Sequence, residues 1–421
     1  MLWSATTLAL EQFRSGVGPS ILGFTLGPDA GGRSWSKALA QYERRAALWA
    51  QLGLGLHHTC VAYNTYIASV LGFLLQLELL PADWPAVEER TLRKLIPGPA
   101  RWIRPADLHN LRRHLCMPHD FHDMAVISVA ARFRVAHREA ASSGGLRVRQ
   151  TVRRLDAMLC ASSHIYRCGR WGHWFRQSFA HNLLDAVTEC GRQGIDIRGI
   201  EADLGALGPQ PHTRAITRRL AQGVQRATRL ALNLSMQFHP ETRLRQKLSK
   251  WSLPLFPRLR AMRAARLLPR LQRLAPPRVV SAVIRTWYNG WCTRRRFQQR
   301  GQCIFGCSLG ADAVEHYICC SRLLRHGEQR LRLPPPTTFA DRGVSFLLLE
   351  PRSNLPTDVL IRRALLLAAA YRLHCRLRHG APIVDDEVLQ RALTQAVKES
   401  AVGHARATQA LDSIWDTTRR S

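Results

Sequence analysis

Four residues in the last third of the chain have the types and the spacing of metal ligands. Cys303 and Cys307 are separated by three residues, and another three separate His316 from Cys320. Zinc prefers four such ligands in a tetrahedral arrangement, usually supplied as two short-range pairs. The spacing therefore predicts one structural zinc ion held by these four side chains. Cys319 is an alternative to Cys320, and the sequence alone does not choose between the two thiols.

Two local features are expected to bring the pairs together. Gly306 allows the positive φ of a tight turn between the first two cysteines. The segment 312–315 has the form of a capping box that opens a helix, on which His316 and Cys320 would share one face. The alternative is that these cysteines are unrelated small core residues. However, five of the eleven cysteines fall within residues 292–320, among polar and glycine-rich neighbours.

The composition indicates a polyanionic partner. Lys and Arg total 61 against 30 Asp and Glu, which gives a formal charge of +31. Nearly all of this excess is arginine, whose planar guanidinium suits bidentate phosphate contacts and stacking on bases. A surplus of this size predicts binding to nucleic acid. GC-biased coding also enriches arginine, but it does not explain why acidic residues are so few.

The segment immediately before the cysteines interleaves guanidinium groups with aromatic rings. Such a mixture can pair with phosphates and stack on unpaired bases. The alternative is that Trp287 and Trp291, four residues apart, form one buried helix face while the arginines are merely solvated. The predicted nucleic-acid contacts are Arg285, Trp287, Tyr288, Trp291, Arg294, Arg295, Arg296, Phe297 and Arg300.

The apolar periodicity predicts a mainly α-helical, multi-lobed array with a short strand or hairpin near the N-terminus and a small zinc knuckle. A chain of 421 residues normally divides into two or three domains. We expect a strand and turn region, a helical domain, an arginine-rich helical linker, the zinc knuckle and a C-terminal helical segment, at residues 1–28, 29–204, 212–300, 301–325 and 337–421.

No residue arrangement typical of catalysis is present. The chain contains no Gly-x-Ser-x-Gly, phosphate-binding loop or His-Glu-x-x-His motif. Asp341 stands alone, and Asp385 and Asp386 follow a proline at an expected helix start, where the helix dipole favours acidic residues. We therefore assign no catalytic residue.

The sequence also bears on location. The longest apolar run, residues 61–80, is interrupted by polar side chains and is predicted to be a buried helix, so no membrane contact is expected. We find no secretory leader, and the odd number of clustered cysteines fits a reducing compartment. The expected location is intracellular, either nuclear or cytoplasmic.

Taken in order, these features resemble the carboxyl-terminal portion of non-LTR (LINE-type) retrotransposon reverse transcriptases. The matching residues are the run ILGFTLG at 21–27, the helical block with AYNTYIASVL at 62–71, and the Cys-x3-Cys-x8-His-x3-Cys knuckle. In that family a short strand after the catalytic palm leads into a helical thumb, and a basic linker ends in a CCHC knuckle. The resemblance implies that residues 1–28 follow a palm, that residues 29–204 are thumb-like, and that the ligand is RNA or an RNA–DNA hybrid.

Two departures from the family limit what the resemblance implies. The family usually has four residues between its last His and Cys, whereas three separate His316 from Cys320 and two separate it from Cys319. The paired aspartates of the palm should lie upstream of Ile21, where only 20 residues are present. We therefore expect a nucleic-acid-binding piece without polymerase activity of its own. The alternatives are a zinc-stabilised helical scaffold for protein partners and a non-functional remnant of an element.

Overall fold

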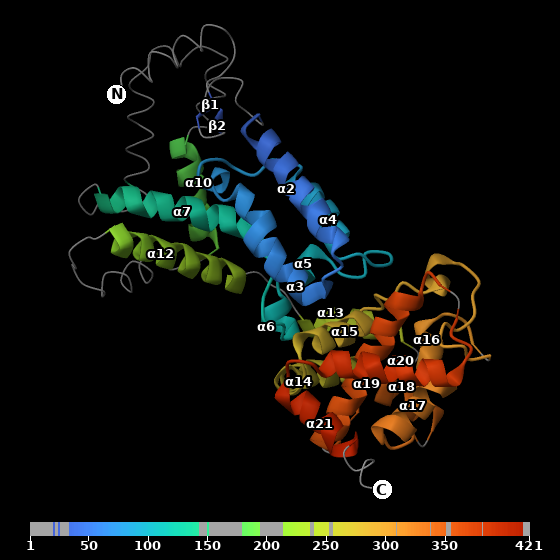
Figure 1. Ribbon diagram of the computed structural model, residues 1–421. Helices are drawn as coiled ribbons and strands as arrows, with labels where there is room; N and C mark the ends of the chain where they lie inside the picture. Colours follow the sequence, from blue (N-terminus) through green and yellow to red (C-terminus); the bar gives the residue numbers. More distant parts are fainter. Residues whose placement is uncertain are drawn as a thin grey trace. The chain divides into compact units, whose positions relative to one another are not determined.

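The computed structural model describes residues 20–21, 24–25, 33–142, 150, 179–193, 214–235, 240–251, 256–308, 310–336, 338–350, 355–380 and 382–415 (Figure 1). This part of the chain is mainly α-helical, as the periodicity predicts. The chain divides into two compact units, each assembled from separate stretches of sequence. Unit 1 comprises residues 1–49, 62–91 and 122–237, and unit 2 comprises residues 50–61, 92–121 and 238–421.

A two-stranded antiparallel pair lies within the run where a strand or hairpin is expected. Strand β1 (Ser20–Ile21) pairs with β2 (Phe24–Thr25), with Ser20 opposite Thr25 and Ile21 opposite Phe24. The glycine pair at 144–145 favours a surface loop, the pattern of residues 150–162 favours a helix, and the segment 205–211 favours a break in the helical array. All three lie wholly or almost wholly outside the described residues.

Unit 1 is a helical assembly whose core forms where α7 packs against α10 and α12. Phe133, Leu183 and Val224 are buried in this core. Arg132 is also buried, and its guanidinium donates to the Asn182 carbonyl over 2.8 Å, which ties α7 to α10. The helices lying wholly or mostly in this unit are α2 (Arg33–Gln51), α4 (Trp84–Leu95), α7 (Met124–Ser142), α10 (Phe179–Arg192) and α12 (Arg214–Ser235).

The apolar run 61–80 is not the single helix that was predicted. Helix α3 (Gly55–Ala62) ends early in the run, and three short π and 3₁₀ turns follow at Tyr63–Ile67, Ala68–Leu71 and Leu74–Gln76. Within the described part of the chain, no helix has the length and apolar character needed to cross a membrane.

Unit 2 is built around α19 (Thr357–Leu377), which is buried along most of its length. A helix that is apolar on nearly all sides must be covered on nearly all sides. Helices α15, α17, α18, α20 and α21 all pack against it. The other helices of this unit are α5 (Pro105–Leu108), α6 (Leu111–Leu115), α13 (Pro240–Leu248), α14 (Pro257–Leu274), α15 (Pro277–Trp287), α16 (Val314–Tyr317), α17 (Ser321–Leu331), α18 (Phe339–Phe346), α20 (Asp386–Ala401) and α21 (Ala405–Trp415).

Two local predictions in unit 2 are wrong. The prolines that alternate with arginines in residues 251–277 favour only short helical pieces, but α14 continues through Pro269. Pro269 is exposed, while Ala264, Leu268 and Leu271 form a buried apolar face that offsets the lost backbone hydrogen bond. The apolar run 344–349 is typical of a strand, but it forms the end of α18 and the turn after it.

Candidate metal centre

Two backbone stretches around the first two cysteines pair as a short hairpin. The Cys303 N–H donates to the Gly310 carbonyl over 2.8 Å, and the Gly306 N–H donates to the Cys303 carbonyl over 3.0 Å. Gly306 has a φ of +71°, so the positive φ predicted there is confirmed. A Cβ atom at Gly306 would lie 2.0 Å from the Ile383 carbonyl oxygen, so this turn requires glycine for space as well as for conformation.

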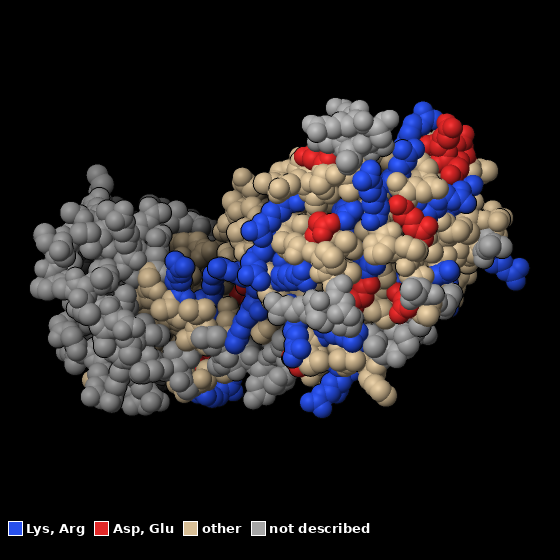
Figure 2. Space-filling model, turned by 90° about the horizontal axis from the view of Figure 1, so that it is seen from below, with Lys and Arg blue, Asp and Glu red and all other residues tan. Residues whose placement is uncertain are grey.

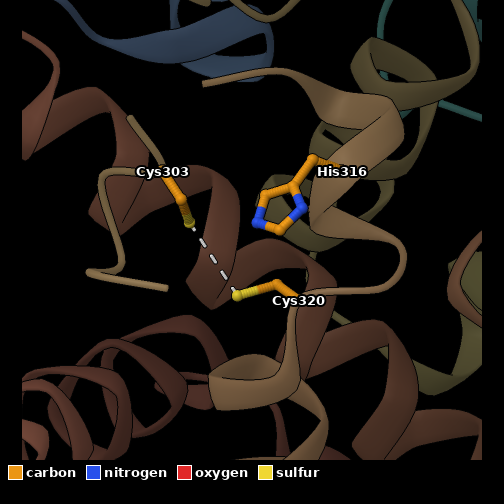
Figure 3. A group of neighbouring side chains, drawn as sticks. All are labelled: Cys303, His316 and Cys320. Carbon is orange, nitrogen blue, oxygen red and sulfur yellow. Dashed lines mark hydrogen bonds between the residues drawn. The ribbon is translucent and has the colours of Figure 1, made fainter. Parts of the chain in front are cut away.

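Three of the predicted metal ligands lie together. The ligand atoms of Cys303, His316 and Cys320 are all within 4.8 Å of one another, and the two sulfur atoms are 3.9 Å apart. Figure 3 shows the imidazole of His316 directed toward these sulfurs. Both cysteines are buried, and the buried Nε2 of His316 has no hydrogen-bond partner among the described residues. A buried nitrogen and two buried sulfurs that converge in this way could hold a metal ion.

His316 and Cys320 do not lie on one face of a single helix, contrary to the prediction. His316 lies in α16, which ends at Tyr317, and Cys320 is the residue that precedes α17. The two ligands therefore come from different helices, and the turn between α16 and α17 brings them together. The predicted capping box is absent, because Ala313 precedes α16 and no side chain caps that helix.

The hydrogen bond between the two buried thiols shifts their pKa values in opposite directions. The bond from Cys320, helped by the backbone groups of Cys307 and Phe305, outweighs burial and lowers the pKa of Cys303. The same bond and burial raise the pKa of Cys320. The shared hydrogen bond therefore stabilises the thiolate form of Cys303 and disfavours that of Cys320. A bound cation would stabilise both as thiolates, since the thiolate is the ligand form.

The predicted fourth ligand, Cys307, lies beside the group but outside it. Its sulfur is 3.7 Å from the Ser321 hydroxyl oxygen. The neighbouring Cys320 and Cys307 raise the pKa of His316, although burial opposes the shift. Metal binding must therefore compete with a proton on this imidazole.

The structure favours Cys320 over Cys319 as a ligand. Burial raises the pKa of Cys319, and the Arg342 guanidinium beside it opposes that rise. Cys319 is thus adjacent to an arginine and is not part of the Cys–His–Cys group.

A buried aspartate connects the hairpin to the central helix. The Asp312 carboxylate accepts the Arg294 N–H over 2.9 Å and the Tyr317 hydroxyl, and it lies 3.6 Å from Nε2 of His374 on α19. The Tyr317 ring packs between Phe305 and other buried rings. The sequence interpretation missed this network because Asp312 was assigned to a helix cap. A histidine inside the apolar pattern of 357–379 was the available signal.

Three of the predicted stacking residues are inside the protein. Trp287, Tyr288 and Trp291 are 0%, 1% and 0% exposed. The Trp287 indole donates to the Leu347 carbonyl over 2.9 Å, and the Trp291 indole donates to the Thr286 hydroxyl over 3.0 Å. The prediction that these rings stack on bases is wrong for this conformation, because the buried helix face accounts for them.

Arg285 also has a structural position. Its guanidinium lies 4.5 Å from the ring centre of Trp102 and 5.4 Å from that of Tyr371, and it donates to the Gly290 and Pro97 carbonyls. These contacts use two of its five N–H donors and place two aromatic rings of the protein beside its guanidinium. We therefore remove Arg285 from the nucleic-acid contacts.

The remaining predicted contacts surround a 3₁₀ turn, η5 (Arg294–Phe297). Phe297 is 53% exposed, and Arg295 and Arg300 are exposed as well. Arg294 and Arg296 are half-buried. This turn therefore presents an aromatic ring beside guanidinium groups at the surface.

The aspartates considered as catalytic candidates cap helices. The Asp385 carboxylate accepts the Val388 N–H over 3.1 Å at the start of α20. Asp341 forms a capping box with Thr338 at the start of α18. The helix-start interpretation of Asp385 is confirmed, and Asp341 has the same kind of role.

We expect replacement of Gly310 by alanine to weaken metal binding by about tenfold or more while the fold is retained. A Cβ atom there would lie 2.0 Å from Cε1 and Nδ1 of His316 and would push the imidazole out of position. Competition with a chromophoric chelator would measure the affinity. Gly380→Ala is the control, because its new Cβ meets only the Leu377 carbonyl at an ordinary 3.6 Å. Equal metal affinities for the two variants would show that the position of the His316 imidazole does not determine metal binding.

Comparison of the chain with protein-family models, curated proteins and solved structures found no match.

Proposed function

We propose that the chain binds nucleic acid through the arginine-rich surface of unit 2, and that a zinc ion stabilises the part that presents this surface. The observation that carries the proposal is the connection made by Asp312. Its carboxylate accepts the Arg294 N–H, and its carbonyl accepts the Arg295 N–H over 3.2 Å. The exposed η5 turn and the candidate ligand loop are therefore held by one buried residue.

The surface charge supports a polyanionic ligand. In the described part of the face drawn in Figure 2, Lys and Arg side chains are spread widely over the surface, with groups of acidic side chains lying among them. The formal charge of the whole chain is +31. Arginine also binds phosphate in a bidentate manner, which suits RNA or an RNA–DNA hybrid as the ligand.

The ligand chemistry supports zinc as the metal. Cys303, His316 and Cys320 converge, and Cys307 lies beside them as the candidate fourth ligand. Three thiolates and one imidazole would form a set that selects zinc among common biological metals. Four protein ligands leave no open position for a reacting water, so the role of the ion is folding. Free thiols also fit the reducing intracellular compartment expected from the sequence.

The ancestry that we propose follows the sequence resemblance. The order of the hairpin run, the helical block and the basic segment before a CCHC knuckle supports a relationship to the carboxyl-terminal part of non-LTR reverse transcriptases. We assign no polymerase activity to this chain itself, because no carboxylate pair suited to two magnesium ions was identified in it.

A salt titration of binding to short single-stranded RNA tests the function. We expect the affinity of the wild-type chain to fall steeply with salt, because each neutralised phosphate releases counterions. The double variant Cys303→Ser/Cys307→Ser should lose zinc and bind RNA more weakly. Zinc content is measured on the same samples.

The opposite result would favour a different class of function. A zinc-loaded chain that ignores RNA at physiological salt would be a helical scaffold for protein partners. The buried aromatic segment 287–291 is the observation that favours this second candidate, because it contributes core packing instead of a base-stacking surface.

A further inference from the structure

A second feature of unit 2 takes no part in the metal centre. A cavity of about 380 Å³ is lined by residues of α14, by Leu348 and Glu350 after α18, and by Leu355 and Leu360 around the start of α19. Its apolar lining consists of Leu259, Met262, Leu267, Leu348, Leu355 and Leu360. A space of this size with an apolar lining accommodates a small planar group.

Three arginines of α14 also line the cavity. Arg263, Arg266 and Arg270 follow one another at intervals of three and four residues, so they lie on one helix face and span about 10 Å. Arg263 donates to the Leu349 carbonyl over 2.9 Å, and Arg270 donates to the Thr357 hydroxyl over 3.1 Å. These bonds hold two of the guanidinium groups in place. Arg266 is exposed to solvent.

One acidic residue, Glu350, completes the lining. Its Oε1 accepts a hydrogen bond from the Arg363 guanidinium, which compensates its charge. Its Oε2 is buried and has no hydrogen-bond partner among the described residues. The lining of the cavity therefore combines apolar side chains with a net positive charge.

We propose that this cavity binds one unstacked nucleotide of a single-stranded nucleic acid. The base lies against the apolar lining, and the neighbouring phosphates lie against the row of arginines. A paired base within a duplex cannot enter, because it would first have to leave its stack. The inference rests on the proposed function and narrows its ligand to a single strand.

The charge pattern favours a nucleic acid over an acidic peptide. Three cations spaced along about 10 Å of helix suit a ligand with one negative charge at each repeat. A peptide with a single carboxylate would need only one of them. The apolar lining alone would also accept an aliphatic side chain. The experiment must therefore measure separately the contribution of the base to binding and the contribution of the phosphate charges.

The experiment compares full-length variants by fluorescence anisotropy with a labelled ten-nucleotide RNA of mixed sequence and with its duplex. Met262→Trp fills the cavity, and Arg266→Glu reverses the exposed charge. Arg273→Glu is the matched control, because this arginine is exposed on the same helix and does not line the cavity. Thermal unfolding and zinc content confirm that each variant is folded.

We expect Met262→Trp to weaken single-strand binding by about tenfold and to leave duplex binding unchanged, because a base contact of this kind is lost. Arg266→Glu should weaken single-strand binding by about tenfold more than Arg273→Glu does. Unchanged single-strand affinity for Met262→Trp, or equal losses for the two arginine variants, would overturn the proposal. An equal loss of affinity for the single strand and the duplex in Met262→Trp would also overturn the proposal, since the cavity would then not contact an unpaired base.

The outcomes also separate this inference from the proposed function. If the wild-type chain binds single-stranded RNA with normal salt dependence and the cavity variants bind as well as the wild type, only the cavity assignment fails. If the wild-type chain binds no RNA, the proposed function and the cavity assignment fail together.

Discussion

Replacement of Cys320 by serine is expected to abolish stoichiometric zinc binding and to lower the melting temperature of the protein by about 10 °C or more. Cys320 is buried in direct contact with the Cys303 sulfur, and serine oxygen is a poor ligand for zinc. Structural zinc contributes its binding free energy to folding, so a chain that cannot bind the ion loses that contribution. Zinc content by mass spectrometry and melting by circular dichroism measure the two effects.

The control for this prediction is the neighbouring thiol. Cys319→Ser should keep its zinc and melt within a few degrees of the wild type, because Cys319 lies beside Arg342 and outside the ligand group. Loss of zinc in Cys319→Ser with retention in Cys320→Ser would reverse the ligand assignment. Zinc affinity should also fall on acidification, because a proton on His316, whose pKa is raised, competes with the metal.

Replacement of Asp312 by alanine is expected to destabilise unit 2 by about 3–5 kcal/mol, as is usual when one partner of a buried charge pair is removed. The change leaves the Tyr317 hydroxyl, the Arg294 N–H and His374 without their shared acceptor. Urea unfolding at pH 6 measures the free energy. RNA affinity should fall as well, because the η5 turn loses its attachment.

The control is an aspartate without such a network. Asp412 is exposed on α21, and Asp412→Ala should change the unfolding free energy by no more than about 0.5 kcal/mol. A loss for Asp312→Ala as small as that for Asp412→Ala would show that the carboxylate is not an anchor.

The Asp312–His374 pair also predicts a pH dependence. Burial opposes ionisation of both groups. However, the nearby His374 and the hydrogen bonds from Tyr317 and Arg294 lower the pKa of Asp312, while the nearby Asp312 and Cys375 raise the pKa of His374. The contribution of Asp312 is present above its ordinary pKa of 3.8 and is lost as the pH falls through its lower folded value. The contribution of His374 is present below 6.5 and is lost as the pH rises through its higher folded value.

The difference in unfolding free energy between wild type and Asp312→Asn should therefore be largest between pH 3.8 and pH 6.5, the ordinary pKa values of the two groups, and should shrink at alkaline pH. Asparagine keeps an acceptor for the Arg294 N–H but lacks the charge opposite His374. A difference that does not change with pH would show that the histidine is neutral in the folded protein.

Several features of this protein follow from the sequence by itself. The helical class follows from apolar periodicity, which depends only on neighbours three and four residues apart. The turn at Gly306 was predictable because its residue type limits the backbone locally. Convergence of Cys303, His316 and Cys320 was expected from ligand types and short spacing, and the net charge needed only counting.

The tertiary structure decided the features that depend on distant residues. Trp287 and Trp291 have the composition of a base-stacking surface, and only their packing against segments far along the chain shows them to be buried. Asp312 has the local pattern of a helix cap, yet its partner His374 lies 62 positions away, on α19. Likewise, Arg266 and Leu360 line one cavity only because α14 lies beside the start of α19. Periodicity and spacing report local geometry, whereas burial and long-range pairing depend on which surfaces the folded chain brings together.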